Sequence, residues 1–439
     1  MIKKIMYFFL FFSFLSAYSQ EVDVEGVSEE YYLKLSKILA EQSSKTKKLY
    51  TSRGANPKYV GDKYDEFSGD FRRYFTSNSL SLGILIYNYE NDSLTLNLVS
   101  KFKNIPETKI AITKSKLSTY IKDVNYLYSS TFFNRAPQKR GTITKGKEKG
   151  KEKLISSFKE LNKILFPDSL NLEIFDHLIL LPALNIGTLP FSCFKIKNEY
   201  LIDKMSYSIA PNIFELVIST QMNHNKHGNM ELGSELAYFW ENALFVSNPK
   251  YPENLEWSFP NLPGAEDEIN YVINKTVPTK VKNLSGLEAT KENILKDICN
   301  FDLLYFATHG INDAENPMDN SFLVLADDKS ETPFITSREI MDIRKKCQLK
   351  ADLVVLSACQ TGLGKAHEGG TIGLARAFQI AGANHVLMSL WNIDDKETAT
   401  LMKFFFDELA IAKELMPHAA LRNAILKYKK EVNDDPKYW

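Results

Sequence analysis

Two residues that could act together in nucleophilic catalysis each follow a short apolar segment. His309 lies near the end of FDLLYFATHG at residues 301–310, and Cys359 lies in ADLVVLSACQTG at residues 351–362. Both segments have strand composition, and in a parallel α/β sheet ligands and chemistry gather at the carboxyl ends of strands. A thiol needs a base to become the nucleophilic thiolate. If the two strands are neighbours, the pair therefore predicts a cysteine hydrolase.

Glycines beside both residues leave room for a substrate. Gly310 follows His309, and Gly362 and Gly364 permit a sharp turn after Cys359. Backbone N–H groups just past the cysteine can then face a developing oxyanion. Taken singly, Cys359 could be an inert buried thiol and His309 a hydrogen-bonded core histidine. Their joint placement at two strand ends, 50 residues apart as in caspases, favours the catalytic interpretation.

Strands and helices alternate regularly from about residue 243 onward. Such alternation implies βαβ units and a mostly parallel sheet. The cysteine strand is apolar throughout (LVVL), as expected of a strand buried on both faces. The predicted strands are 243–247, 281–284, 302–308, 352–358 and 385–391, and the predicted helices are 265–272, 291–299, 369–382 and 396 onward.

The preceding part of the chain has a less regular pattern. Asn91-Asp92 separates two alternating segments, 81–89 and 93–99, which predicts a hairpin. Further elements are predicted as helices at 117–128 and 153–165, a strand at 177–181, and a tight turn and second strand within 185–211. Residues 21–77 have the pattern of a short polar helical segment. Two parts are expected after it, 78–240 and 241–439, with the His–Cys pair in the second.

Composition excludes several classes of function. Lys plus Arg and Asp plus Glu each number 54, so the net charge is zero and lacks the basic excess of a nucleic-acid-binding protein. The GxGxxG fingerprint, the Walker A loop and the HExxH motif are absent, and no metal-ligand spacing stands out among the four cysteines and seven histidines. We therefore expect no cofactor and no metal.

The N-terminus has the pattern of a secretory signal peptide. Lys3 and Lys4 precede an apolar run at residues 5–15, and small and polar residues follow at 16–20. The run is too short to span a bilayer comfortably, and no later run is long enough for a transmembrane helix. We expect cleavage near Ser19 or Gln20 and an exported protein, periplasmic or secreted, with no transmembrane segment after cleavage.

The remaining cysteines are Cys193, Cys299 and Cys347. An even cysteine count in an exported protein can indicate disulfides. A chain of this size does not need them for stability, however, and no C-x-x-C pair is present. We expect three core thiols, with a bridge between two of them as the open alternative.

Several ordered motifs resemble the CHAT domain, a caspase-like peptidase family related to separases. They are LPFSCF (189–194), LPGAEDEI (262–269), ATHG (307–310), LSACQTGLG (356–364) and EGGTIGLARAFQIAGANHVLMSLWNIDD (368–395). The resemblance covers roughly residues 78–439. It implies a caspase-like α/β fold, in which a mostly parallel sheet is flanked by helices and the N-terminal half is a degenerate pseudo-peptidase.

The resemblance also implies a role for each residue of the pair. His309 would be the general base and Cys359 the nucleophile. The backbone amides of Gly310 and Cys359 would form the oxyanion hole, which stabilises the charge that develops on the substrate carbonyl oxygen.

Substrate preference is implied as well. Separases and their relatives favour a basic residue before the cut, held by an acidic pocket that suits a guanidinium fork. Asp395 is the best match in this chain, with Asp394 and Glu368 as further candidates. Alternatively, the two aspartates only cap the helix that begins near Lys396, because Asp is a favoured N-cap residue.

Together these patterns predict an exported cysteine endopeptidase that hydrolyses protein substrates after Lys or Arg. The alternative is a catalytically latent scaffold of the same fold that signals by binding partner proteins. CHAT proteins often carry tetratricopeptide arrays ahead of the peptidase, and no such consensus occurs between the leader and the first strand. A regulatory or activating protein is therefore expected as a separate chain or within a longer parent protein.

Overall fold

Two five-stranded sheets organise the described residues. The computed structural model describes residues 81–100, 106–129, 150–211, 216, 240–253, 258–313, 316–327, 332–357, 365–367, 370–391, 395–411 and 416–439. The expected signal peptide and the helical segment at 21–77 lie outside these residues. The strands of the first sheet end at residue 209 and those of the second begin at residue 242. The division into halves at 240/241 and the degenerate character of the first half remain predictions.

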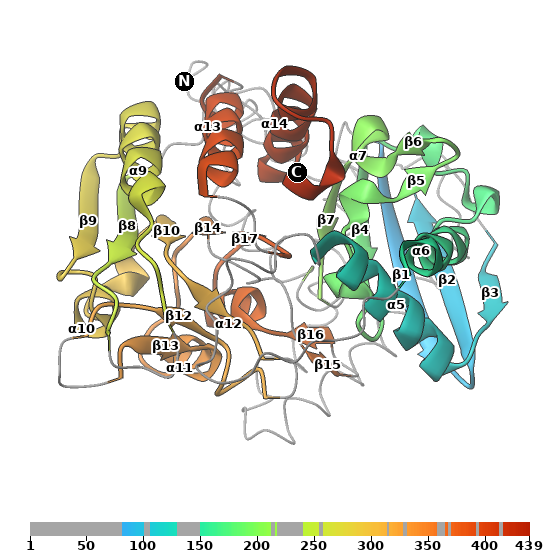
Figure 1. The fold of residues 1–439 in the computed structure, drawn as a ribbon, viewed down its shortest axis with the longest axis horizontal. Coiled ribbons are helices and arrows are strands. Elements are labelled where there is room, and N and C mark those ends of the chain that lie inside the picture. The colour runs from blue at the N-terminus through green and yellow to red at the C-terminus, as the bar shows by residue number, and fades with distance from the viewer. Residues whose placement is uncertain are drawn as a thin grey trace, which may run out of the picture.

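The first sheet is mixed, with the order β3-β2-β1-β4-β7. β1 (Leu82–Glu90) and β2 (Ser93–Ser100) form an antiparallel hairpin where one was predicted. Asn91 and Asp92 have positive φ angles of 49° and 52°, as a two-residue type I′ turn requires. The other elements are β3 (Thr108–Ala111), β4 (His177–Leu181), β7 (Ser206–Ile209), α5 (Lys114–Ser129), α6 (Lys151–Leu165) and α7 (Leu201–Lys204) (Figure 1).

The second sheet runs parallel at every pairing of its strands, in the order β17-β14-β10-β8-β9. Its strands are β8 (Asn242–Pro249), β9 (Lys280–Gly286), β10 (Leu303–Ala307), β14 (Leu353–Leu356) and β17 (His385–Met388). Every residue of β10 and β14 is buried, as expected of strands covered on both faces. The predicted fold class, a mostly parallel sheet flanked by helices, is confirmed.

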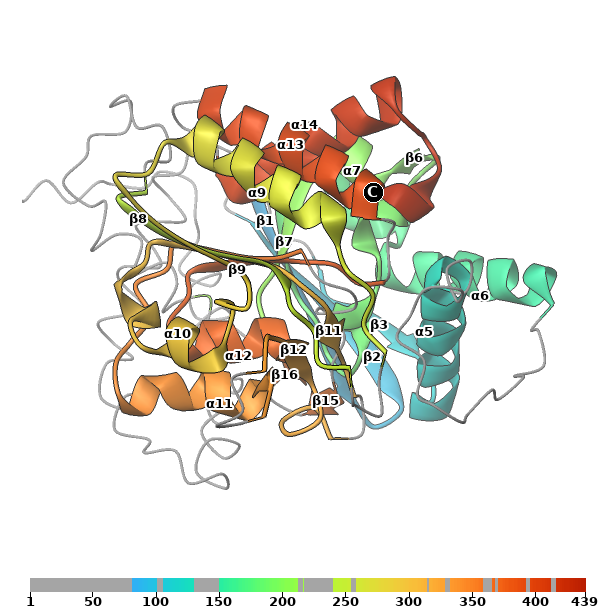
Figure 2. The same ribbon diagram turned by 60° about the vertical axis from the view of Figure 1, so that its left-hand side comes forward.

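Helices cover both faces of the second sheet (Figure 2). One face carries α9 (Pro263–Thr276), α13 (Asp395–Ile411) and α14 (Pro417–Glu431), and the other carries α10 (Lys291–Leu295), α11 (Ser337–Asp342) and α12 (Leu374–Ala381). Successive side chains of a strand point to opposite faces. Tyr305 accordingly belongs to the core that includes α9 and α13, whereas Phe306 belongs to the core that includes α11 and α12.

Two predicted helices are shorter than expected. The helix predicted at 291–299 ends at Leu295, and a 3-10 turn follows at Ile298–Asn300. The helix predicted at 369–382 is wrong in its first residues, because β16 (Gly370–Ile372) pairs antiparallel with β15 (Lys365–His367). Glycine and the β-branched residues Thr371 and Ile372 have low helix propensity, so α12 begins only at Leu374.

The expectation of three core thiols is wrong for two of the cysteines. Cys299 and Cys347 form a disulfide with a Cα–Cα distance of 6.3 Å. The bridge joins the 3-10 turn before β10 to the segment that follows α11. Cys193 is a buried free thiol, as expected. The open alternative of one bridge among the three is therefore the correct one.

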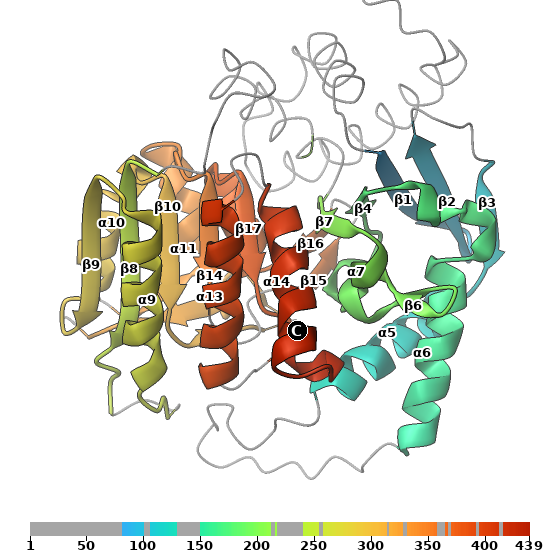
Figure 3. The same cartoon turned by 90° about the horizontal axis from the view of Figure 1, so that it is seen from above.

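Helix α14 joins the two sheets, because it lies beside α13 and also against β7 of the first sheet (Figure 3). At this junction the rings of His177 and His418 stack with centroids 3.7 Å apart. The two imidazoles share one hydroxyl, since His177 Nδ1 lies 2.9 Å and His418 Nδ1 lies 3.1 Å from Ser206 Oγ. Burial and, to a smaller extent, the nearby His385 lower the pKa of His418 to about 3. Burial, together with the His418 ring, also holds the pKa of His177 well below its usual value.

We predict that acid weakens this junction. The pKa of His418 in the folded chain lies below the unfolded value of about 6.5, so the unfolded chain binds the proton more readily. The free energy of unfolding should therefore fall as the pH drops from about 6.5 towards 3, by about 2–3 kcal/mol at pH 4.5 for His418 alone. Urea titrations of wild type and His418→Phe at pH 7.5 and 4.5 measure this change in the free energy of unfolding. The variant should lose less stability on acidification, and an equal loss in both proteins would contradict the prediction.

Candidate active site

His309 lies at the topological switch point of the second sheet. β8 and β10 are neighbours, but α9 follows β8 on one face and α11 follows β10 on the opposite face (Figure 2). Ligand sites of open α/β sheets lie outside the carboxyl ends of strands at such points. His309 comes two residues after the end of β10. The fold therefore places this imidazole where a ligand site is expected.

The segment between β8 and α9 fixes the His309 ring, which is only 5% exposed. His309 Nε2 lies 2.7 Å from the carbonyl oxygen of Pro260. The rings of Tyr251 and Phe259 lie 4.9 Å and 5.5 Å from the imidazole, centroid to centroid. Aromatic contacts of this kind contribute about 0.5–1.5 kcal/mol each. A carbonyl oxygen only accepts, so Nε2 carries the hydrogen, and Nδ1 is the nitrogen of the neutral ring that can take up a proton.

The backbone around His309 is held by β12 (Phe322–Val324). The N–H of Val324 donates to the carbonyl of His309 at 2.9 Å. Thr308 Oγ1 donates to the carbonyl of Val324 at 2.5 Å and lies 3.2 Å from the hydroxyl of Tyr251. One threonine hydroxyl thus links the aromatic residue that contacts the imidazole to the strand that supports it.

Gly310 is oriented by the same ladder. β11 (Gly310–Ile311) pairs antiparallel with β12, with Gly310 opposite Leu323. Hydrogen-bonded and non-bonded pairs alternate along an antiparallel ladder. Because His309 and Val324 are a bonded pair, Gly310 and Leu323 are a non-bonded pair. The N–H of Gly310 therefore faces away from β12.

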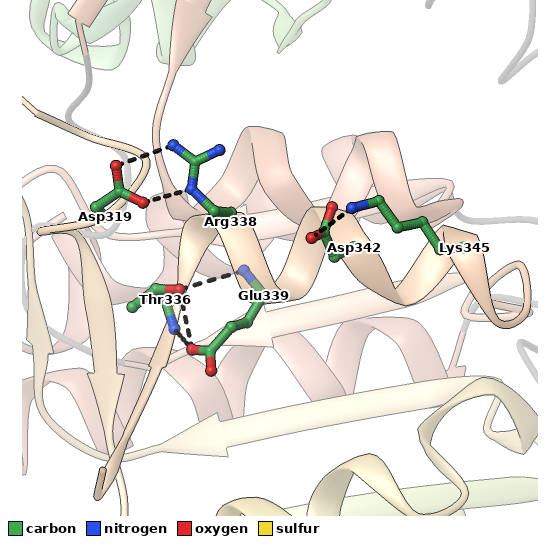
Figure 4. Close-up of polar contacts among 6 residues, drawn as sticks. All are labelled: Asp319, Thr336, Arg338, Glu339, Asp342 and Lys345. Atoms are coloured by element: carbon green, nitrogen blue, oxygen red, sulfur yellow. Dashed lines mark hydrogen bonds and ion pairs between the residues drawn. The ribbon is translucent and has the colours of Figure 1, made fainter. Parts of the chain in front are cut away.

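Helix α11 anchors the segment between β11 and β12 (Figure 4). The helix starts with a capping box, in which Thr336 and Glu339 each bond the other's backbone N–H. The guanidinium of Arg338 forms a two-bond ion pair with Asp319, and the N–H of Arg338 donates to the carbonyl of Met318 at 2.9 Å. Charge-assisted pairs of this geometry are strong and directional. The chain that follows Gly310 is consequently tied to a helix of the opposite layer.

The register of β10 on β14 relates the two predicted catalytic positions. The paired residues, from Leu303 opposite Leu353 to Phe306 opposite Leu356, all differ by 50 in number. His309 and Cys359 also differ by 50. Positions 309 and 359 therefore come the same number of residues after the paired residues of two neighbouring parallel strands. Cys359 itself lies outside the described residues.

The predicted substrate-binding residues are described only in part. Helix α13 begins at Asp395, one residue before the predicted start near Lys396. The side chain of Asp395 and the whole of Asp394 and Glu368 lie outside the described residues. The acidic pocket and the alternative capping role both remain predictions.

The described residues offer neither a candidate metal site nor a candidate membrane span. Within the described ranges, no group of three or more His, Cys, Asp or Glu side chains could hold a metal ion. Among the helices of the same ranges, none combines the length and apolar character of a membrane span.

Sequence reasoning missed the residues that orient His309. Tyr251, Phe259 and Pro260 follow β8 and precede the LPGAEDEI motif. Their aromatic and proline content after a buried strand was the available signal. The decisive contact is made by a main-chain carbonyl, and its position depends on the fold rather than on residue type.

Sequence comparisons gave a matching family model and two similar proteins. The family model of the CHAT domain matches residues 156–439, more than half of the chain. The chain is 26% identical to tetratricopeptide repeat protein 28 of Homo sapiens over 268 residues and to the same protein of Mus musculus over 256 residues. These matches cover 53% and 50% of this chain but 10% of each relative, so the chain spans about a tenth of their length.

Two solved structures are similar at low sequence identity. One is the Saccharomyces cerevisiae separase–securin complex, with 12% identity, a TM-score of 0.48, and coverage of 88% of this chain and 31% of that chain. The other is the Arg-specific cysteine proteinase gingipain R, with 12% identity, a TM-score of 0.42, and coverage of 64% of this chain and 65% of that chain.

We predict that neutral His309 is the Nε2–H tautomer. The Pro260 carbonyl cannot donate, so the hydrogen bond at Nε2 requires the proton on that nitrogen. Long-range 1H–15N correlation spectra above pH 8 should show His309 Nε2 protonated and Nδ1 unprotonated, with the signals assigned by their loss in His309→Asn. A dominant Nδ1–H form would contradict the geometry.

Proposed function

Because this chain belongs to the CHAT domain family, we propose that it is a cysteine endopeptidase with His309 and Cys359 as its catalytic dyad. The observation that carries the proposal is the register of β10 on β14, whose offset of 50 equals the separation of the two residues. Parallel neighbours with this register bring positions 309 and 359 to the same edge of the sheet. The orientation of His309 by Pro260 supports the role of the imidazole as base.

The proposed mechanism follows from the tautomer and from the Gly310 backbone. His309 takes the thiol proton on Nδ1, and the Cys359 thiolate forms a bond to the carbonyl carbon of the scissile peptide. The N–H of Gly310 faces away from β12 and can donate to the resulting oxyanion, together with the proposed N–H of Cys359. His309 then protonates the leaving amine as the C–N bond breaks. Water attacks the thioester, which releases the acid and restores the thiol.

The dyad is tested by hydrolysis of a diverse fluorogenic peptide library, using chain that lacks residues 1–20. Cys359→Ala and His309→Ala should each lower kcat by about 10³-fold or more, because nucleophile and base act as one unit. Cys193→Ala is the matched control, since it removes the other free thiol, which is buried in the first part of the chain, and should retain activity.

Two other outcomes would count against this dyad. Undiminished turnover by Cys359→Ala would exclude this nucleophile. No turnover by folded wild-type protein, with or without added partners, would favour the alternative of a latent scaffold that acts by binding proteins.

Specificity for Lys or Arg before the scissile bond is part of the proposal and rests on Asp395, with Asp394 and Glu368 as further candidates. A carboxylate that faces a guanidinium in a desolvated pocket forms a strong charge-assisted pair. Asp395→Asn should lower kcat/KM for Arg substrates by about 10²-fold and leave Ala substrates within about threefold, because only the charged pair is lost. Asp394→Asn and Glu368→Gln test the two further candidates in the same assay. An unchanged Arg/Ala ratio in Asp395→Asn would remove Asp395 from the pocket.

Export and regulation by a protein partner complete the proposal. The leader pattern at residues 1–20 and the Cys299–Cys347 disulfide support export to the periplasm or beyond, because structural disulfides persist mainly in oxidising compartments. The expected partners are a protein substrate and a regulatory or activating protein. No nucleic acid is expected, since the net charge is zero.

A further inference from the structure

A buried tyrosine–glutamate pair lies in the layer between β10 and α9. Tyr305 is 0% exposed and Glu268 is 1% exposed. The phenol hydroxyl donates to Glu268 Oε1 at 2.5 Å. The rings of Phe245 and Phe406 lie 5.9 Å and 5.8 Å from the Tyr305 ring. A buried carboxylate costs free energy, and apolar residues of the same volume often stabilise a core more. Stability alone is therefore a poor account of this pair.

Tyr305 of this pair lies on β10, the strand that leads to His309 of the proposed dyad. Tyr305 is four residues before His309 and is paired with Val355, which is four residues before Cys359. The Ser357 hydroxyl, between Val355 and Cys359, also hydrogen-bonds to the Tyr305 phenol. One phenol oxygen is thus shared by helix α9 and by the segment that leads to the proposed nucleophile.

The start of helix α9 is also attached near the ends of β10 and β8. The Pro260 carbonyl just before the helix accepts from His309, and the N–H of Leu262 donates to Asn248 Oδ1 at 2.8 Å. Glu268 lies further along α9, in the LPGAEDEI motif, and reaches back to β10. Helix α9 and the segment just before it are therefore linked to β10 and its end at two points. One is the imidazole of His309, and the other is Tyr305, four residues earlier in the chain.

We propose that Glu268 and Tyr305 are positioning residues. Their hydrogen bond fixes the ends of β10 and β14 relative to α9, so that the His309 imidazole and the Cys359 thiol meet. The inference rests on the proposed function. Neither residue contacts substrate in this scheme. Misplacement of reacting groups by about 1 Å can cost about 100-fold in rate, so a small loss of alignment has a large effect.

Tyr305→Phe tests the proposal, because it keeps the ring and removes the shared hydroxyl. Tyr428→Phe is the matched control: its hydroxyl donates to Glu397, its ring is also fully buried, and both partners lie in α14 and α13. For each protein, the rate of Cys359 alkylation by iodoacetamide is followed from pH 5 to 9.5 by peptide mass mapping. Steady-state kcat and KM are measured on the best library peptide.

An aligned imidazole favours the thiolate at low pH. Alkylation of Cys359 in Tyr305→Phe should therefore be at least fivefold slower than in wild type at pH 6.5, and the two rates should converge at pH 9.5. kcat should fall by about 10–100-fold with KM within about threefold, since alignment affects the transition state more than binding. Tyr428→Phe should keep the wild-type profile. Ser357→Ala should shift the profile in the same direction as Tyr305→Phe.

Two substitutions of Glu268 distinguish the effect of its charge from the effect of its hydrogen bond. The amide oxygen of Glu268→Gln can still accept from Tyr305 and should preserve the wild-type profile, whereas Glu268→Leu should lose it. Identical alkylation profiles for wild type and Tyr305→Phe would overturn the proposal, whatever happens to the melting temperature. Failure of the proposed function would give a different result, because the alkylation profile of wild type itself would then match that of His309→Ala.

Discussion

The register of the parallel pair β10 and β14 is the constraint on which the rest of the site depends. Its offset of 50 equals the separation of His309 and Cys359 in the sequence, and the proposed dyad rests on this agreement. A slip by one residue would exchange the faces of all side chains on one strand. Such a slip would move Tyr305 out of the core beneath α9 and Phe306 out of the core beneath α11 and α12. The packing of both layers thus protects the alignment of the proposed dyad.

The site divides its tasks between two layers of the fold. The segment between β8 and α9 orients the imidazole through the Pro260 carbonyl and two aromatic rings. On the opposite face, α11 holds the chain that follows Gly310 through Arg338 and the capping box. A backbone carbonyl suffices for orientation, because a fixed tautomer requires only an acceptor at Nε2.

Helix α14 makes polar contacts at the junction of the two sheets. Arg422 on α14 donates to the carbonyls of Ile202 and Asp203 in the first part, at 2.9 Å and 2.7 Å. His418, one turn earlier, stacks on His177 and shares the hydroxyl of Ser206 with it. Satisfied buried polar groups specify a unique arrangement more than they add stability. The polar character of this junction fits that role, and it makes the junction sensitive to acid.

The sequence by itself predicted the strands of the second sheet, the order of the motifs and the candidate pair His309 and Cys359. It also determined the Asn91-Asp92 turn, because turn chemistry and apolar periodicity are local properties of a chain. It did not reveal that residues 370–372 pair with 365–367, since a three-residue strand has too little periodicity. Only the tertiary structure decided that Cys299 meets Cys347, that Pro260 orients His309 and that Tyr305 bonds Glu268. Each of these contacts joins segments that are distant in sequence, and only the packing of the layers brings them together.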